Sequence, residues 1–339
     1  MPRIVGTGLT ALDLIVADGE SSAGELVASG GGTCGNVLAA LAALGWQSAF
    51  VGAVRRSAIA YVVYDDLKSS GVEVHVSFSD EGSEVPVIVE HVTRSARVGE
   101  VRHWFSFECP RCRRELPRFS RPTDLALQGQ VDAPWFGDVF FADRLSAAIV
   151  ELAAVARERG ALVMYEPSTE ADGPWMREML TLAHVVKFSA DYATTLNLAP
   201  LHEGLWIETQ GAAGFRWKPH GEMRWQSFPA QLAARVVDTC GAGDWFTAGL
   251  LFSLFQSSPH PITASEAQVL QALRRGARLA AWSCGFLGAR GPLYDADATD
   301  AWVALDNPTA SRHRAPRLRP QRPQVPPDLW GHCEHSVTD

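Results

Sequence analysis

The feature that most limits the fold of this 339-residue chain is an alternation of short apolar runs with helix-like segments. The apolar runs begin at residues 3–8 and recur as far as residues 204–208, and most are followed by a segment with helical periodicity. Strands that alternate with helices in this way form a parallel sheet covered by helices. The sequence therefore predicts an α/β fold with a mainly parallel central sheet.

The boundaries of most elements follow from the apolar pattern and from Ser, Gly and Pro at its ends. Strands are expected at 3–8, 48–53, 138–142, 161–166, 184–188 and 204–208, and helices at 34–44, 57–70, 145–159, 174–182, 190–197, 242–256 and 263–284. Segments 72–78, 85–92 and 100–107 are expected to be antiparallel strands. Residues 10–30 and parts of 72–107 are predicted to form a small sheet that lies over the main one as a lid.

Residues 1–305 are expected to form one domain, and two segments stand outside its regular pattern. Residues 108–123, rich in Arg and Pro, are interpreted as an insertion. Residues 306–339 are rich in Pro and Arg and show little periodicity, so a mostly disordered tail is expected.

The insertion contains Cys109-Pro110-Arg111-Cys112, a pair that allows three interpretations. The two thiols can be free in a surface loop, can form half of a structural zinc site, or can form a redox pair. Further zinc ligands are available at His103 and at three residues of the tail, His332, Cys333 and His335.

The segment Asp238-Thr239-Cys240-Gly241-Ala242-Gly243-Asp244 runs directly into an apolar helix-like stretch. The first turn of a helix offers backbone N–H groups and the positive end of the helix dipole, which together bind phosphate. Glycines let that backbone approach a ligand closely, and Asp244 can take a proton from an attacking hydroxyl. The pattern favours phosphoryl transfer to an alcohol, although a tight turn before a helix is the alternative.

A second glycine cluster, Ser29-Gly30-Gly31-Gly32-Thr33-Cys34-Gly35-Asn36, precedes an Ala/Leu helix. It can be a loop that allows close helix–sheet packing, or a backbone surface for a polyol to which Asn36 offers a donor and an acceptor. Asp13, after the first strand, can accept hydrogen bonds from two neighbouring hydroxyls or can be a solvated loop acid.

Taken together, these segments resemble the ribokinase-like (PfkB) family of carbohydrate kinases in order and spacing, over roughly residues 3–295. The resemblance implies a three-layer fold with a small β lid, ATP as the phosphoryl donor and Mg²⁺ as a cofactor. It also implies that segment 284–291 lies near the nucleotide base and, in some members, a monovalent cation. The residues that match family positions are Asp244 as catalytic base; Gly241, Ala242 and Gly243 as the anion hole; Asp13, Gly31, Gly32 and Asn36 at the substrate; and Thr209, Gly211 and Lys187 on the nucleotide side.

Three segments depart from the family pattern. Where the family often has Lys-x-Asn-x-x-Glu, this chain has Lys187-Phe188-Ser189-Ala190-Asp191-Tyr192, so polar residues that support Mg²⁺ are replaced. Glu166-Pro167-Ser168 replaces Asp-Pro-Asn, and Arg55-Arg56-Ser57 replaces Gly-Asp-Asp. Glu166 and Asp191 remain as candidates for the metal, and a divergent member of the family is expected.

The charge and composition restrict the partners. The formal net charge of −8 points away from nucleic acid, and no apolar run reaches the length of a membrane span. A small sugar-like substrate is expected, and a sugar phosphate is less favoured because no basic cluster adjoins Gly31-Gly32. Arg94, Arg97 and Arg102 would change this if the lid directed them inward.

Other properties of the chain stay as alternatives. A nucleoside kinase and a non-catalytic sugar- or nucleotide-binding protein are the competing functions. The protein is expected to be a monomer, or a homodimer through the lid if the outer face of the lid is apolar. Six cysteines in a chain of this length do not resemble a disulfide framework, and the N-terminus lacks a signal-peptide pattern, so a cytoplasmic location is expected.

Overall fold

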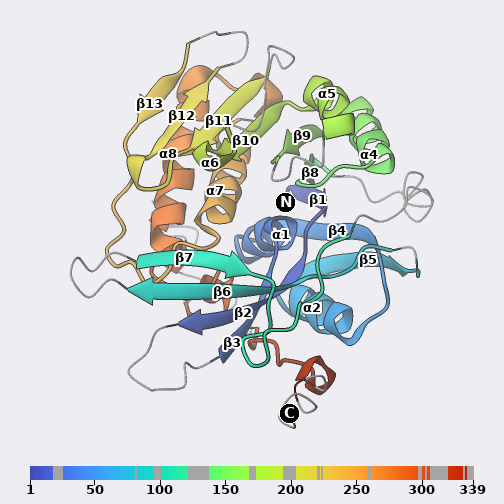
Figure 1. The fold of residues 1–339 in the computed structure, drawn as a ribbon. Helices are drawn as coiled ribbons and strands as arrows, with labels where there is room; N and C mark the ends of the chain where they lie inside the picture. The colour runs from blue at the N-terminus through green and yellow to red at the C-terminus, as the bar shows by residue number, and fades with distance from the viewer. Residues whose placement is uncertain are drawn as a thin grey trace.

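The computed structural model describes residues 1–17, 26–80, 82–94, 101–120, 137–167, 173–193, 204–219, 222, 224–258, 261–296, 300–301, 304–305, 320–330 and 333 (Figure 1). In this part of the chain, a nine-stranded sheet carries helices on its faces and a four-stranded sheet lies beside it. Within these residues, no helix combines the length and the apolar character needed to cross a membrane.

The large sheet has the strand order β13-β12-β11-β10-β9-β8-β1-β4-β5. Its strands are β1 (Arg3–Thr7), β4 (Gln47–Val54), β5 (Val72–Phe78), β8 (Val139–Ala142), β9 (Leu162–Tyr165), β10 (Val185–Ser189), β11 (Leu205–Thr209), β12 (Phe215–Lys218) and β13 (Gln226–Phe228). Every neighbouring pair from β11 to β5 is parallel, and only β12 and β13 run antiparallel to their neighbours. The predicted mainly parallel sheet is confirmed.

Helices cover both faces of this sheet. The helices are α1 (Thr33–Ala43), α2 (Ala58–Ser69), α4 (Ala147–Glu158), α5 (Gly173–Leu182), α6 (Ala190–Ala193), α7 (Ala242–Ser257), α8 (Glu266–Ser283) and α9 (Gly291–Asp295). Successive strand residues point to opposite faces: Phe141 joins the core beneath α1 and α7, whereas Phe140 joins the core beneath α4 and α5. The result is the three-layer α/β arrangement that the sequence predicts.

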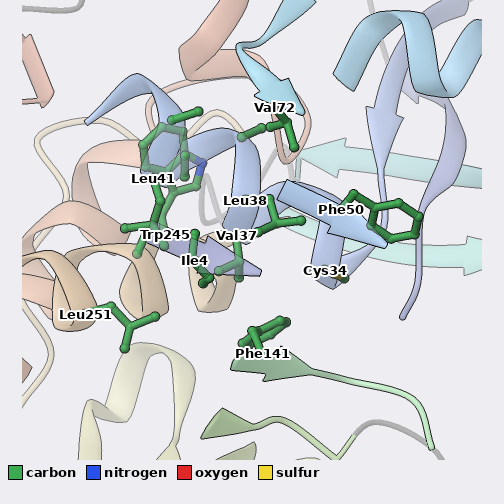
Figure 2. Close-up of a cluster of buried hydrophobic side chains, with 14 of the residues drawn as sticks. Ile4, Cys34, Val37, Leu38, Leu41, Phe50, Val72, Phe141, Trp245 and Leu251 are labelled. Atoms are coloured by element: carbon green, nitrogen blue, oxygen red, sulfur yellow. The ribbon is translucent and has the colours of Figure 1, made fainter. Parts of the chain in front are cut away.

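The core on the α1 and α7 face places the two glycine motifs relative to each other. Figure 2 shows Leu38 and Leu41 of α1 and Trp245 of α7 converging near Ile4 of β1. These side chains are at most 2% exposed, so the two helices are packed firmly against each other and against the sheet. Because each helix follows one glycine motif, this packing brings the two motifs together.

The small sheet has the order β3-β2-β6-β7 and is built from parts of the two segments, 10–30 and 72–107, that were expected to form the lid. Its strands are β2 (Ala11–Ala17), β3 (Leu26–Gly31), β6 (Val87–Arg94) and β7 (Val101–Ser106), with β2 and β6 parallel and the other pairs antiparallel. The prediction for residues 72–78 is wrong in orientation: β5 pairs in parallel with β4 in the large sheet. The physical reason is that helix α2 connects β4 to β5, and such a crossover joins parallel strands.

The insertion and the tail contact the rest of the molecule. In the described part of the insertion, Leu116 N–H donates to Phe107 O at 2.8 Å, and Val87 N–H donates to Pro117 O at 3.0 Å. Part of the tail differs from the disorder expected for it: residues 320–330 include a short 3-10 helix, Pro327–Trp330, in which Leu329 is 7% exposed. Residues 306–319, 331–332 and 334–339 lie outside the described residues.

Candidate active site

The site lies at the carboxyl end of β1, where the strand order changes direction. Strand β1 has β8 on one side and β4 on the other, and the chain leaves β1 to enter the lid. The carboxyl ends of parallel strands at such a switch point are the usual ligand-binding edge of an α/β sheet. Leu9 N–H here donates to Asp143 Oδ1 at 2.9 Å, and Gly35 N–H donates to Leu9 O at 3.2 Å, which fixes the start of α1 at this edge.

The glycine motif of residues 238–244 starts α7 in a form suited to an anion. Gly241 precedes the helix with φ = 73°, in the left-handed region, and no side chain within the described residues caps the helix. A Cβ at Gly241 would lie 2.5 Å from the Cβ of Ala289, so a larger residue does not fit. Ala242 N–H donates to Thr239 O at 3.3 Å, whereas the N–H groups of Gly241 and Gly243 have no acceptor among the described residues. Two of the three residues predicted for the anion hole therefore offer a backbone N–H to a ligand.

Asp244 lies on this first turn and contacts the other glycine motif. Asn36 Nδ2 donates to Asp244 Oδ2 at 2.7 Å, and Asp244 is 9% exposed. Burial raises the pKa of Asp244 to about 7, with a further increase from the charge of Glu166; the Asn36 hydrogen bond and Lys187 oppose the shift. A carboxyl with a pKa near neutrality can exchange a proton with a hydroxyl at physiological pH.

A buried ion pair lies beneath the anion hole. Lys187 Nζ donates to Glu166 Oε2 at 2.8 Å, and the two side chains are 5% and 7% exposed. The Thr247 hydroxyl donates to the other oxygen of Glu166. A Cβ at Gly243 would lie 3.7 Å from Lys187 Nζ, so the Lys187 ammonium group lies beside the first turn of α7. The structure thus places Lys187, paired with Glu166, beside the first turn of α7.

Asp13 and the glycine motif of residues 29–36 form the opposite side of the site. Asp13 lies on β2 and is 4% exposed, and a Cβ at Gly31 would lie 2.0 Å from Asp13 Oδ2. Gly32 has φ = 83° and passes so close to Leu9 that a Cβ would lie 2.5 Å from its carbonyl oxygen. Burial raises the pKa of Asp13 to about 7, while Arg290 lowers it and Asp238 raises it. Only glycine fits at residue 32, whereas a side chain at residue 31 would displace the Asp13 carboxyl group.

Arg290 is a residue of the site that sequence reasoning missed. It is 1% exposed, and its Nη1 lies 2.5 Å from Asp66 Oδ2. Its Nε donates to Asn36 Oδ1 at 3.0 Å, and its Nη2 donates to Gly31 O at 3.1 Å. Arg290 therefore orients the Asn36 amide so that its nitrogen faces Asp244. The segment around Arg290 is flanked by glycines, and its pattern alone favours a helix end and a turn.

On the side of the lid, the site is bordered by Glu90 and His103 of the lid and by Asp238. Ligand atoms of Glu90, His103 and Asp238 lie within 4.8 Å of one another. Burial, followed by the charges of Asp238 and Asp13, raises the pKa of Glu90 to about 9. His103 Nδ1 lies 2.8 Å from Thr239 Oγ1, so the lid contacts the motif directly. Sequence reasoning missed Glu90, since an inward-facing polar residue on a lid has no local pattern. It named His103 as a possible zinc ligand for Cys109 and Cys112, but His103 groups with Glu90 and Asp238 and not with those cysteines.

Of the residues predicted on the nucleotide side, Lys187 lies beside the first turn of α7, and Thr209 and Gly211 lie farther along the same sheet edge. Thr209 ends β11 and pairs with Ser189 at the end of β10, and Gly211 opens a short 3-10 helix with φ = 54° and open space around it. Asp191 is exposed on α6. In the described chain, no hydrogen bond or ion pair links Thr209, Gly211 or Asp191 to Asp244. The helix expected at 190–197 is described only as far as residue 193.

Comparison with known proteins agrees with this geometry. The model of the pfkB family carbohydrate kinases matches residues 127–296, half of the chain. The chain belongs to the pfkB family of carbohydrate kinases. This kinase is 24% identical over 277 residues to probable fructokinase-5 of Arabidopsis thaliana, covering 75% of this chain and 83% of the relative.

Solved structures of sugar kinases share the fold of this carbohydrate kinase. Ribokinase from Giardia lamblia superposes with a TM-score of 0.68 at 15% identity, covering 92% of this chain and 100% of that one. Arabidopsis thaliana ribokinase complexed with ribose and ATP superposes with a TM-score of 0.63 at 19% identity, covering 90% and 98%. At these identities, the likeness establishes the ribokinase-like fold.

Gly241 of this kinase allows a test of the anion hole. We expect Gly241→Ala to lower kcat on the order of 10²-fold, because the added methyl overlaps Ala289 and displaces the backbone donors. Gly160→Ala is the matched control: Gly160 has φ = 87° but nothing within 4 Å of its Cβ position. The control carries the left-handed strain of about 1–2 kcal/mol without the overlap. Equal activity of the two variants in steady-state assays would contradict the assignment.

The environment of Asp244 predicts the pH profile. A base must be ionised to accept a proton, so with a pKa of about 7 the kcat/KM should rise with pH and level off above that value. Asn36→Ala removes the hydrogen bond that favours the ionised form, so the acid limb should move to higher pH. Activity measured from pH 5 to 9 tests this, and an acid limb that stays in place would show that Asn36 does not tune Asp244.

Proposed function

We propose that this carbohydrate kinase transfers the γ-phosphoryl group of ATP to a hydroxyl of a free sugar, with fructose as the first acceptor to test. The observation that carries the proposal is a buried Asp244, with a pKa of about 7, on the first turn of a helix that no described side chain caps. The named relative is a probable fructokinase, which supports fructose as the first candidate.

The reaction divides between the two sides of the site. Asp13 and the backbone at Gly31 and Gly32 hold hydroxyls of the acceptor, and one hydroxyl faces Asp244. Asp244 takes the proton of that hydroxyl while the hydroxyl oxygen of the acceptor attacks the γ-phosphorus. The bond from the γ-phosphorus to the bridging oxygen of ADP breaks at the same time. The N–H groups of the first turn of α7 and the Lys187 ammonium stabilise the charge on the transferred group. The lid excludes water that would otherwise compete as the acceptor.

The charges around the acceptor favour a free sugar over a sugar phosphate. Asp13, Glu90 and Asp238 are all buried on this side, and Arg290 is already paired with Asp66. Arg94 and Arg102 are exposed on the lid, and Arg97 lies outside the described residues. The phosphate group that a sugar-phosphate substrate already carries would lie against carboxyl groups here rather than against cations.

The residues fit Mg²⁺ only in an indirect way. Both carboxylate oxygens of Glu166 are engaged, by Lys187 and by Thr247, and Asp191 is exposed on α6. Mg²⁺ usually keeps several waters and binds through phosphate oxygens, so Glu166 would act through a water. When bound with ATP, Mg²⁺ would supply neutralisation of phosphate charge. Assays without Mg²⁺, and with and without K⁺, test the divalent and the monovalent cation.

An ADP-release screen distinguishes the candidate functions. We expect turnover with a free sugar, at levels well above those with sugar phosphates; a nucleoside as the best acceptor would establish the nucleoside kinase alternative. Tight sugar or ATP binding by calorimetry without turnover would establish the non-catalytic alternative. A cytoplasmic location, proposed from the cysteine content, fits a reaction that consumes ATP.

We also propose a homodimer through the lid. Trp104 and Phe105 lie on the edge strand β7 and are 50% and 49% exposed. The two residues are consecutive and so project from opposite faces of β7: Phe105 lies on the face of His103, and Trp104 lies on the other face against His91. An exposed large aromatic on each face of a sheet edge suits pairing with a second copy. Light scattering at several protein concentrations distinguishes this dimer from the monomer.

A further inference from the structure

Three cysteine thiols, two in the insertion and one 221 residues beyond Cys112, converge beside the lid. Cys109 Sγ lies 3.5 Å from Cys333 Sγ, which lies 3.2 Å from Cys112 Sγ. The three sulfur atoms all lie within 4.8 Å of one another. All six cysteines of the chain belong to the described residues, and none of them forms a disulfide. The kinase chemistry uses none of these three thiols.

The backbone around the first two thiols forms a tight turn. Cys109 N–H donates to Arg114 O at 2.7 Å, and Arg113 N–H donates to Cys109 O at 2.9 Å. The backbone of Arg114 also hydrogen-bonds the Cys112 thiol. Arg113 has φ = 65° and is the one residue other than glycine with positive φ among those described. This conformation costs about 1–2 kcal/mol outside glycine, so the turn holds both sulfurs on one side against an intrinsic preference.

We propose that Cys109, Cys112 and Cys333 bind a structural zinc ion that fastens the C-terminal segment to the insertion. In a tetrahedral zinc–thiolate site the Zn–S bond is about 2.3 Å, which sets neighbouring sulfurs about 3.8 Å apart. The distances of 3.2 and 3.5 Å therefore need only small movements. On binding, each thiol gives its proton to the solvent and a sulfur–zinc bond forms in its place.

The sequence offers the fourth ligand that a structural zinc requires. His332 and His335 stand within two residues of Cys333 in the sequence, and the placement of both lies outside the described residues. Three thiolates and one neutral histidine around Zn²⁺ carry a net charge of −1. The arginines at 111, 113 and 114 directly adjoin the turn and suit this charge.

A zinc ion accounts for the convergence of three sulfurs better than a disulfide does. A disulfide joins two sulfurs and leaves the third without a role, whereas Cys333 here lies close to both Cys109 and Cys112. The Cys-x-x-Cys spacing is also that of half a zinc site. Of the three interpretations that the sequence allows for Cys109 and Cys112, the geometry favours the metal.

The ion would connect the lid with the end of the chain. On one side, the insertion is hydrogen-bonded to the end of β7 through Leu116 and to the start of β6 through Pro117. On the other side, Arg322 Nη2 lies 2.5 Å from Asp295 Oδ2, and Leu329 joins the main core cluster. Figure 1 shows the C-terminal segment, in red, on the side of the molecule that carries the lid. Zinc would therefore stabilise the tail and the lid without entering the reaction.

Metal analysis of the full-length protein tests the proposal independently of kinase activity. Protein purified under reducing conditions should contain about one zinc per chain. Cys112→Ser and Cys333→Ser should each lose most of it, whereas Cys284→Ser, a cysteine outside the cluster, should retain it. Cobalt-reconstituted protein should show thiolate charge-transfer bands and strong visible bands of a tetrahedral site, which both cluster variants should lack.

The opposite results are equally clear. Absence of zinc from the wild type after reconstitution with zinc sulfate in reducing buffer would overturn the proposal, as would full zinc retention in both cluster variants. An intact mass showing a disulfide among these cysteines in protein purified without reductant, with no zinc uptake after reduction, would establish the redox alternative. Circular dichroism of each variant confirms that loss of zinc is not loss of the fold.

Discussion

Asp244→Asn lowers kcat by about 10²–10⁴-fold, the usual effect of losing a general base. The asparagine keeps the size of the side chain and can still accept the hydrogen bond from Asn36, so the first turn of α7 keeps its shape. It cannot take the proton of the acceptor hydroxyl. Steady-state kinetics with the best acceptor from the ADP-release screen measures the effect. The KM for ATP should change little, because the backbone of the first turn of α7 is intact.

The stability of this variant separates loss of the base from loss of the fold. The pKa of Asp244 is about 7 in the folded protein and 3.8 as its ordinary value. Between these values the unfolded chain ionises while the folded one holds its proton, so this group lowers stability as pH rises. Asp244→Asn removes that cost, and the Tm at pH 7 should be unchanged or higher. A variant with the kcat of the wild type would refute the role of Asp244. The control is Asp65→Asn, the same substitution at an exposed residue of α2.

Arg290→Met lowers the free energy of unfolding by about 3–5 kcal/mol, because it leaves the buried Asp66 without its charge partner and with only the hydrogen bond from the Tyr294 hydroxyl. Both side chains are 1% exposed, so water cannot replace the lost guanidinium. The substitution also removes the hydrogen bonds to Asn36 and to the Gly31 carbonyl. Denaturant unfolding followed by fluorescence measures the change.

Two further variants make the Arg290 result specific. Lys68→Met breaks an ion pair on the same helix α2, but Lys68 and Asp65 are 58% and 73% exposed, so the loss should stay below about 1 kcal/mol. Removing both buried charges with Asp66→Leu and Arg290→Met together should cost less than the sum of the single changes. Additive losses, or a Lys68→Met effect as large as that of Arg290→Met, would contradict a buried coupled pair.

Local pattern was enough to predict much of the fold and both glycine motifs. The helix of residues 57–70 was marked by Ser57, whose hydroxyl accepts from Ala60 N–H in the structure, and by Gly71 beyond its end. The motif at Asp244 was recognisable because a helix start that binds an anion needs glycine and an acid within a few consecutive residues. Such features are local, so the sequence alone reveals them.

The parts that could not be predicted depend on contacts between distant residues. Arg290 lies 254 residues from Asn36 along the chain, and no spacing rule relates the two. Glu90 on β6 and His103 on β7 face the site because of the register of β6 with β2 and of β7 with β6. Cys333 stood in a segment whose composition indicates disorder, and only its proximity to Cys109 and Cys112 in space gives it a role.

The Arg290 contacts also bear on the order in which the protein matures during synthesis. The Gly30–Gly31 backbone emerges early from the ribosome, yet Tyr294 and Arg290, which hold it, are added more than 250 residues later. Domains usually begin folding from the N-terminal side as they are made. The sheet can therefore form around a loose acceptor loop that acquires its final shape only when translation is nearly complete, so a truncated chain would remain a scaffold without a sugar-binding surface.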